Sequence, residues 1–531
     1  MSEGEASLHR SSGVMALGTI ASRATGFLRL AAIAGALGLS RVADPYNVAN
    51  TLPNIVYELL LGGILTSVVV RPLVQAARED DDDGERFAQA LLTFVVVALA
   101  VTVLLGEVFA PAIVRAYGSR LDPAQLRLAT GLLRLFLPQV LFYGAGATMG
   151  AILNARGRFG APMAVPVLNN VVVVAAALLF VTLPGPRPPS PDTLTTAQFL
   201  VLGAGTTLGI VAQTLALVPF LCRAGFRFRA RRIDSDRLSS LARLGGWVLT
   251  YVVANQLGYL VVVRLATGAR TEGGYTAYTY AFQLFSLPHA IVAVSVITAL
   301  APAISGHAVA GDLGLVRSEL ARGLRLIGVI LVPAAVGLAV LARPVAVVAL
   351  SHGALGGDDA AFIGRVLVAF ACGLLPFSAF QLLARVFYWL QDSRTPAVVN
   401  IAVNAVNVVI DVAFALALDG RSRIVAMAAG YAASYVVGAV VLVVLLRRRL
   451  DGLDLHRTIR TLARALVAAG IAGLGAYGVD ALVRKTFDAG VSGSLVSLLV
   501  ASVVGGGLYV AAARRMHVAE LQAVDRLVRR R

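Results

Sequence analysis

The chain has 531 residues, of which 58% are hydrophobic and 14% are charged, with a mean hydropathy of +0.80. A soluble globular domain carries about 25% charged residues, so this composition excludes that class and is typical of a polytopic membrane protein. The formal net charge of +17 would suit a nucleic-acid-binding protein, but the arginines stand in separate loops between apolar runs, and without one contiguous basic face we exclude nucleic acid as a partner.

The hydropathy pattern predicts an all-α protein with about fourteen transmembrane helices, because apolar runs of 18 or more residues are typical of membrane spans. The predicted spans are 14–39, 47–75, 88–112, 125–153, 162–183, 197–222, 242–267, 276–304, 321–348, 361–390, 396–418, 423–446, 462–482 and 491–513. The first span is longer than the apolar core of a signal peptide, so we expect it to be an uncleaved anchor.

The first predicted span contains two arginines, Arg23 and Arg29. Six residues of helix separate them by about 9 Å along the helix axis. A charge near the bilayer centre costs about 2.5–3.5 kcal/mol, so such residues usually face a polar cavity. Reaching out to the membrane surface is the alternative, which is plausible for Arg23 and weaker for Arg29. Two fixed cations at this depth predict a binding site for an anion that crosses the bilayer.

Two acidic residues belong to the second predicted span, Asp44 just outside it and Glu58 within it. Glu58 could line the same polar cavity, or it could form a fixed buried ion pair with an arginine, and the sequence leaves both readings open. Arg264 stands near the outer end of the seventh span, where reaching to the membrane surface is the favoured interpretation.

The eleventh span carries Asn407 and Asp411 four residues apart, with Asn400 and Asn404 on nearby turns. Oxygen ligands stacked on one helix face suit Na⁺ or a protonatable carboxyl group. Asparagines that join helices by hydrogen bonds are the alternative. We therefore predict Asn407 and Asp411 as ion-binding residues, with Asp411 as the candidate Na⁺ ligand. No catalytic residue and no other cofactor is predicted.

Two pairs of prolines indicate an internal duplication. Pro53 and Pro288 stand in similar segments (288 − 53 = 235), and so do Pro162 and Pro396 (396 − 162 = 234). Nearly equal offsets predict two homologous halves of six spans, which share one orientation and enclose a site at their interface. Arginine-rich alternate loops place both termini in the cytoplasm by the positive-inside rule.

The expected organisation follows from this duplication and from the basic loops. The segments are a cytoplasmic tail (1–13), an N-lobe (14–222), a basic cytoplasmic loop (223–241), a C-lobe (242–446), a second basic loop (447–461), two added helices (462–513) and a basic cytoplasmic tail (514–531).

Four motifs together resemble the MurJ (MviN) family, the lipid II flippases of the multidrug/oligosaccharidyl-lipid/polysaccharide exporter superfamily. They are SRATGFLR at 22–29, LPN at 52–54, GAILNARGRFGAPMAVPVLNN at 150–170 and SRTP at 393–396. The resemblance implies a central cavity in which Arg23, Arg29 and Asp44 match substrate-binding positions. It also implies that Asn407 and Asp411 match sodium-site positions, and that the last two helices help to form a groove for the lipid tail.

The chain departs from the family pattern at two places. Relatives carry an arginine just after LPN, where Tyr57 and Glu58 follow here. They carry another arginine in the eighth span, where this chain has Gln283, with Ser286 where a glutamate is common. These departures put the contacts of Glu58 and Gln283 with the head group in doubt, and Arg264 is a candidate to compensate.

The resemblance implies a transporter rather than an enzyme. Its expected task is to move lipid II, an undecaprenyl-diphosphate-linked disaccharide-peptide, from the cytoplasmic to the outer leaflet of the bacterial plasma membrane by alternating access, for cell-wall synthesis. Na⁺ or H⁺ coupling and the membrane potential are the candidate energy sources. Membrane lipids and the cell-wall synthesis machinery are the other expected partners.

Other functions remain as alternatives. A cation-coupled multidrug antiporter of the same superfamily would line its cavity with carboxylates and aromatic rings rather than arginines, and a flippase for polysaccharide-linked lipids would differ only in its substrate. A prenyl-phosphate enzyme would need an Asp-rich metal motif, and the acidic run at 79–83 lacks partners. A membrane scaffold would not require duplicated halves.

Overall fold

The computed structural model describes residues 3–59, 71–79, 82, 84–234, 252–487, 490–518 and 520. Every regular element within these residues is a helix, which confirms the expected all-α membrane class. Ten helices are long and apolar enough to cross a membrane, and eleven if the bent pair Gly357–Ala371 and Leu374–Trp389 forms one span. Of the other predicted spans, 14–39 falls on the more polar helix α1, while 47–75 and 242–267 extend outside the described residues.

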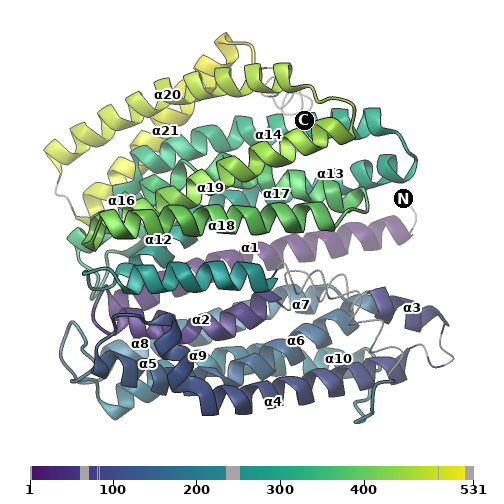
Figure 1. The fold of residues 1–531 in the computed structure, drawn as a ribbon, viewed down its shortest axis with the longest axis vertical. Coiled ribbons are helices and arrows are strands. Elements are labelled where there is room, and N and C mark those ends of the chain that lie inside the picture. Colours follow the sequence, from purple (N-terminus) through teal and green to yellow (C-terminus); the bar gives the residue numbers. More distant parts are fainter. Residues whose placement is uncertain are drawn as a thin grey trace. The chain divides into compact units, whose positions relative to one another are not determined.

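The chain divides into two compact units, which we describe separately (Figure 1). Unit 1 comprises Met1–Gln256 and His352–Ala354, and unit 2 comprises Leu257–Ser351 and Leu355–Arg531. The helices of unit 1 are α1 (Glu3–Leu37), α2 (Ala43–Leu59), α3 (Arg71–Glu79), α4 (Glu85–Tyr117), α5 (Pro123–Phe136), α6 (Pro138–Ala155), α7 (Gly160–Ala164), α8 (Pro166–Thr182), α9 (Thr196–Leu215) and α10 (Val218–Arg223).

Unit 2 begins within the apolar helix Val252–Thr267. Its later elements are α12 (Gly274–Pro288), a π-helical turn (His289–Ala293), α13 (Val294–Val309), α14 (Leu313–Val340), α15 (Ala342–Leu350), α16 (Gly357–Ala371), α17 (Leu374–Trp389), α18 (Arg394–Ala417), α19 (Gly420–Arg449), α20 (Leu455–Thr486) and α21 (Val491–Arg515).

The two units repeat an aromatic contact, which supports the duplication inferred from the prolines. In unit 1 the rings of Tyr46 and Phe136 meet edge to face with their centroids 5.5 Å apart. In unit 2 Tyr278 and Phe370 make the same kind of contact at 4.9 Å. The tyrosines are offset by 278 − 46 = 232 residues and the phenylalanines by 370 − 136 = 234, so equivalent helices pack through equivalent residues.

A second contact, between a glycine and an asparagine on neighbouring helices, also occurs in both units. A Cβ at Gly26 of α1 would lie 3.6 Å from Asn170 Nδ2 on α8. A Cβ at Gly258 would lie 2.9 Å from Asn404 Oδ1 on α18. The offsets are again 258 − 26 = 232 and 404 − 170 = 234. Small residues let membrane helices approach closely. The Asn170 amide also donates a hydrogen bond across the contact to Thr25 of α1, whereas the Asn404 amide donates one to Asn400 of its own helix.

Helices α20 and α21 join unit 2 through a seam of small residues. α20 packs against both α14 and α21 (Figure 1). The seam includes the buried alanines Ala465, Ala468 and Ala472, and the Tyr509 hydroxyl of α21 donates a hydrogen bond to the Val329 carbonyl of α14 at 2.6 Å. Close packing and an interhelical hydrogen bond hold the added pair, because burial of apolar surface gives no net driving force in lipid.

Exposed apolar side chains form a stripe along α4. At least half of the residue surface is exposed at each of Val97 (57%), Val101 (50%), Leu104 (66%) and Val108 (73%). Their spacing of three or four residues places them on one face of the helix. A face this apolar and this exposed requires lipid rather than water as its neighbour.

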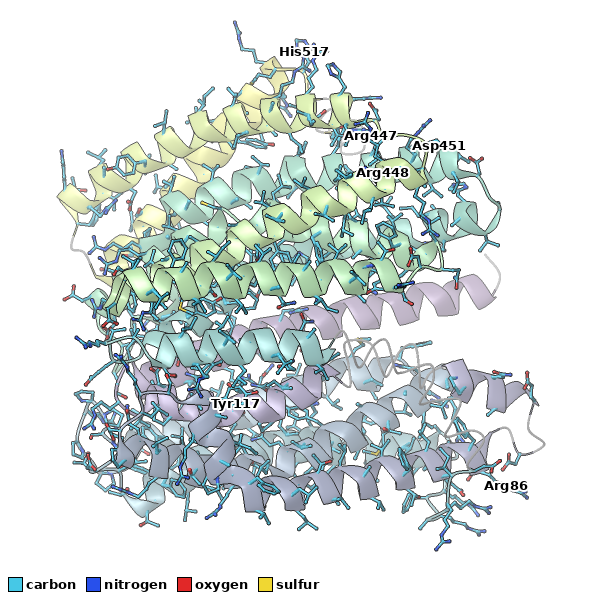
Figure 2. The ribbon with its side chains drawn as sticks, in the orientation of Figure 1. Arg86, Tyr117, Arg447, Arg448, Asp451 and His517 are labelled. Carbon is cyan, nitrogen blue, oxygen red and sulfur yellow. The ribbon has the colours of Figure 1, made fainter. Side chains whose placement is uncertain are left out.

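Each unit has arginines at both of its ends, and we call basic the end that carries the arginine-rich loops predicted to be cytoplasmic. In unit 2, Arg447 and Arg448 close α19 near Asp451, and His517 follows α21 at the same end (Figure 2). In unit 1, Arg86 stands at the start of α4 and Tyr117 at the opposite end of that helix (Figure 2). The basic ends are the ends that the positive-inside rule assigns to the cytoplasm.

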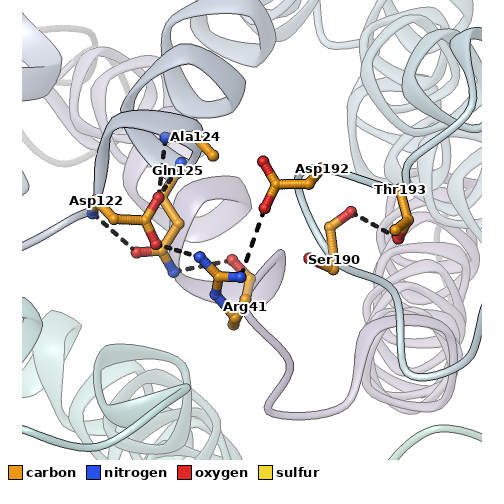
Figure 3. Close-up of polar contacts among 7 residues, drawn as sticks. All are labelled: Arg41, Asp122, Ala124, Gln125, Ser190, Asp192 and Thr193. Carbon is orange, nitrogen blue, oxygen red and sulfur yellow. Dashed lines mark hydrogen bonds and ion pairs between the residues drawn. The ribbon is translucent and has the colours of Figure 1, made fainter.

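The opposite end of unit 1 is held by an ionic cluster (Figure 3). Arg41, between α1 and α2, forms ion pairs with Asp122 at the start of α5 and, at 3.6 Å, with Asp192 in the α8–α9 loop. Asp122 also caps α5, since its carboxylate accepts hydrogen bonds from the N–H groups of Ala124 and Gln125, both at 2.9 Å. Burial raises the pKa of Asp122, but the Gln125 N–H and the Arg41 guanidinium outweigh burial and hold it below its usual 3.8.

We expect Asp122→Asn to lower the thermal stability of the full chain at pH 7. The amide keeps the helix cap but loses the attraction to Arg41, which is worth about 0.2–1 kcal/mol for an exposed pair. A depressed pKa stabilises the fold above pH 3.8, and this contribution disappears as the pH falls through the lower folded-state value. Melting curves from pH 7 to pH 3 should therefore converge for the two proteins, and a constant gap would contradict the assignment.

Candidate functional site

Arg23 and Arg29 lie on the continuous helix α1, but on different sides of it. Six residues turn an α-helix by about 600°, which leaves the two side chains about 120° apart around the axis. Arg23 is exposed, whereas Arg29 is half-buried. Within the part of the chain that the structure describes, neither guanidinium forms an ion pair with a carboxylate.

Arg29 belongs to a polar patch inside unit 1. Its guanidinium is close enough to Tyr46 of α2 for an electrostatic interaction, and the Tyr46 hydroxyl shares a hydrogen bond of 3.0 Å with the Thr206 hydroxyl of α9. One turn before Arg29, the Thr25 hydroxyl accepts a hydrogen bond of 3.0 Å from Asn170 of α8. The Asn170 bond holds α1 against α8, and the half-buried Arg29 interacts electrostatically with Tyr46 of α2.

The other predicted substrate-binding residues lie on three helices, with Asp44 and Glu58 both on α2. Asp44 is buried in the first turn of α2, and the side chain of Glu58 lies outside the described residues. Arg264 is exposed in the last turn of the helix Val252–Thr267. Gln283 is exposed on α12, where its carbonyl accepts a hydrogen bond from Ser286. Their roles in binding stay predictions.

Asn407 and Asp411 form a buried pair on α18. The Asn407 amide donates a hydrogen bond to Asp411 Oδ2 at 3.1 Å. The second oxygen, Asp411 Oδ1, is buried and has no hydrogen-bond partner among the described residues. It faces Gly430 of α19, where a Cβ would stand only 2.4 Å away, and Tyr278 is close enough for an electrostatic interaction.

This arrangement leaves a carboxyl group in the membrane interior with an unused oxygen. An ionised carboxylate in such a place is costly unless a cation balances it. Across the described residues no group of three His, Cys, Asp or Glu could hold a metal ion together. The described residues therefore place a single carboxyl group with an unused oxygen at this position.

Sequence reasoning missed the two tyrosines that face these charged groups. Tyr46 lies beside Arg29 in unit 1, and its duplicate Tyr278 lies beside Asp411 in unit 2. The available signal was their offset of 278 − 46 = 232 residues, close to the offsets of the prolines. The duplicated helices thus present the same phenol to a cation in one unit and to an anion in the other.

Comparison with known families decides where the chain belongs. The family model described as "Lipid II flippase MurJ" matches residues 33–500. The chain belongs to the MurJ family.

Individual relatives agree with this assignment. A "Probable lipid II flippase MurJ" from Haemophilus influenzae is 27% identical over 400 residues, covering 72% of this chain and 76% of the relative. One from Vibrio cholerae is 28% identical over 409 residues, 75% of each chain. The "Lipid II flippase MurJ" of Burkholderia cenocepacia is 27% identical over 395 residues, covering 72% of this chain and 74% of the relative.

Solved structures share the fold. "Lipid II flippase MurJ, inward closed conformation" superposes with a TM-score of 0.77 at 18% identity and covers 95% of this chain and 98% of its own. An inward-facing multidrug resistance MATE family transporter of the MOP superfamily gives 0.66 at 14% identity, covering 80% of this chain and 94% of its own. The MurJ family and the multidrug transporters are thus built on a common helix arrangement.

Proposed function

We propose that this chain is a lipid II flippase, which carries the lipid-linked peptidoglycan precursor from the cytoplasmic to the outer leaflet by alternating access. The observation that carries the proposal is the MurJ family match over residues 33–500. The many apolar helices support a location in the bacterial plasma membrane. The two arginines of α1 without a described carboxylate partner support an anionic cargo.

The proposed role of Arg23 and Arg29 is to bind the diphosphate of the lipid. Arginine suits this task because its planar guanidinium donates two parallel hydrogen bonds to phosphate oxygens. Arg29, which lies near Tyr46, would bind the diphosphate from one side of α1. The exposed Arg23 would bind it from the adjacent side of the same helix. Asp44, Glu58, Arg264 and Gln283 are proposed to contact the head group as well.

The proposed orientation places both basic ends and both termini in the cytoplasm. A membrane potential that is negative inside then favours outward movement of an anionic head group by about 2.3 kcal/mol per charge per 100 mV. Inward movement of Na⁺ or H⁺ through the Asp411 site is proposed to reset the transporter. The buried oxygen of Asp411 without a described partner supports this coupling.

The proposal is tested with the full chain in vesicles that contain a labelled lipid II and an impermeant reagent for its head group. We expect the reagent to reach lipid II of the inaccessible leaflet only in vesicles that contain the protein. Vesicles with a labelled phosphatidylcholine serve as the control, because the proposal requires selectivity for the diphosphate. Equal movement of both lipids, or of neither, would contradict it.

The alternative is a multidrug antiporter, which the shared MATE fold makes reasonable. A pump for organic cations needs carboxylates that attract its substrate, whereas α1 presents two arginines. Efflux of an organic cation driven by a Na⁺ or H⁺ gradient in the same vesicles, without movement of lipid II, would favour the antiporter.

A further inference from the structure

A pocket of about 530 Å³ opens in unit 2 at the end opposite its basic end. It lies where α14 and α20 end and where α15, α16 and α19 begin, far along these helices from Arg447 at the other end of α19. Its volume is in the range of small-molecule sites. Its charged lining consists of Arg343, Arg365, Arg421, Arg484, Asp358 and Asp480.

Two of the four arginines are neutralised within the fold. Arg484 pairs with the buried Asp480 of the same helix, which also accepts a 2.6 Å hydrogen bond from the Ser497 hydroxyl of α21. Arg421 pairs with Asp359 of α16 at 3.3 Å. These pairs hold the walls of the pocket in place, and their charges are largely satisfied.

The other two arginines keep their charge for a ligand. In the described residues neither Arg343 nor Arg365 forms an ion pair with a carboxylate. Arg365 is held over the ring of the buried Phe362 at 5.9 Å, and the same ring carries Arg421 at 4.9 Å. The ring thus fixes the direction of the Arg365 side chain, and its guanidinium is presented ready-oriented.

One side of the pocket is apolar. On α16 the lining residues Ala361, Arg365 and Val368 follow the spacing of a single helix face, with Val368 39% exposed. Ala339 and Val340 at the end of α14 complete this side. The lining therefore places aliphatic side chains on either side of Arg365, so the pocket combines guanidinium groups with apolar surface, as a phospholipid combines a phosphate group with apolar chains.

We propose that this pocket binds the phosphate group of a phospholipid in the outer leaflet, with Arg343 and Arg365 as its ligands. The pocket contains neither arginine of α1, and the proposal rests on the proposed membrane orientation but not on lipid II transport. Asp358, exposed at the pocket, is the opposing charge. It weakens the attraction for an anionic head group, so its removal should strengthen binding.

The test uses the full-length protein, stripped of lipid in detergent and titrated with phosphatidylglycerol under native mass spectrometry. We expect Arg343→Gln/Arg365→Gln to weaken the tightest binding step by about tenfold or more, since each guanidinium donates charge-assisted hydrogen bonds. Asp358→Asn should strengthen the same step. The control Arg120→Gln/Arg270→Gln removes two exposed loop arginines that do not line the pocket and should change binding less than twofold.

Three results would overturn the proposal. Equal losses in the test and control pairs would mean that general surface charge binds the lipid. Complete displacement of phosphatidylglycerol by inorganic diphosphate at equal concentration would assign the pocket to a soluble anion. Unchanged binding in Asp358→Asn, measured on a protein with a native melting curve, would remove the pocket from the binding step even if the double arginine variant failed to fold.

Discussion

Replacing Arg29 with alanine is expected to reduce lipid II translocation by about ten- to a hundredfold in reconstituted vesicles. The loss corresponds to a charge-assisted contact with the diphosphate, which contributes about 1.5–3 kcal/mol. Arg23→Ala should act in the same direction with a smaller effect, because Arg23 is exposed whereas Arg29 is half-buried. Initial rates at lipid II concentrations well below saturation provide the measurement, because a lost binding contact lowers the rate there.

Two further variants separate charge from geometry at this position. Arg29→Lys keeps the charge but loses the planar fork, so we expect a partial loss. Arg120→Ala removes an exposed arginine from the loop after α4 and should leave the rate unchanged. A wild-type rate in Arg29→Ala at substrate concentrations well below saturation would remove this arginine from the proposed binding site.

Most of the helices could be predicted from sequence, because a membrane span needs a long apolar run whatever its neighbours in the fold. The predicted span 88–112 corresponds to α4, Glu85–Tyr117. The helix is longer because its polar ends extend beyond the apolar run. The break between α16 and α17, with a bend of 48°, was not predicted, since hydropathy is continuous across it and only backbone geometry distinguishes one helix from two.

The candidate site was predictable where it depends on spacing within one helix and not where it depends on packing. Asn407 and Asp411 are four residues apart, and the structure joins them by a hydrogen bond of 3.1 Å. The different surroundings of Arg23 and Arg29 follow from the packing of α8 against α1, which includes the hydrogen bond from Asn170. The packing of α8 against α1 is a tertiary contact, and a hydropathy profile contains no information about the rotation of a helix around its axis.

Replacing Asp411 with asparagine is expected to abolish the stimulation of lipid II translocation by an inward Na⁺ or H⁺ gradient. Asparagine keeps the size of the side chain but cannot release a proton or balance a bound cation. Typical coupling free energies change an affinity by about 5- to 150-fold. In Asp411→Asn we expect the translocation rate measured with a gradient to equal the rate measured without one. Rates with Na⁺, H⁺ and no gradient would identify the ion at the same time.

Asp480→Asn is the matched control, because Asp480 is equally buried in unit 2 but its charge is already balanced by Arg484. It should lower stability and retain the response to the gradient. Gly430→Ala tests the geometry, since its Cβ would stand 2.4 Å from Asp411 Oδ1 and force that carboxylate to turn. We expect a weaker apparent cation affinity with the maximum rate retained. A full gradient response in Asp411→Asn would show that the cation binds elsewhere, and the buried oxygen would then serve helix packing alone.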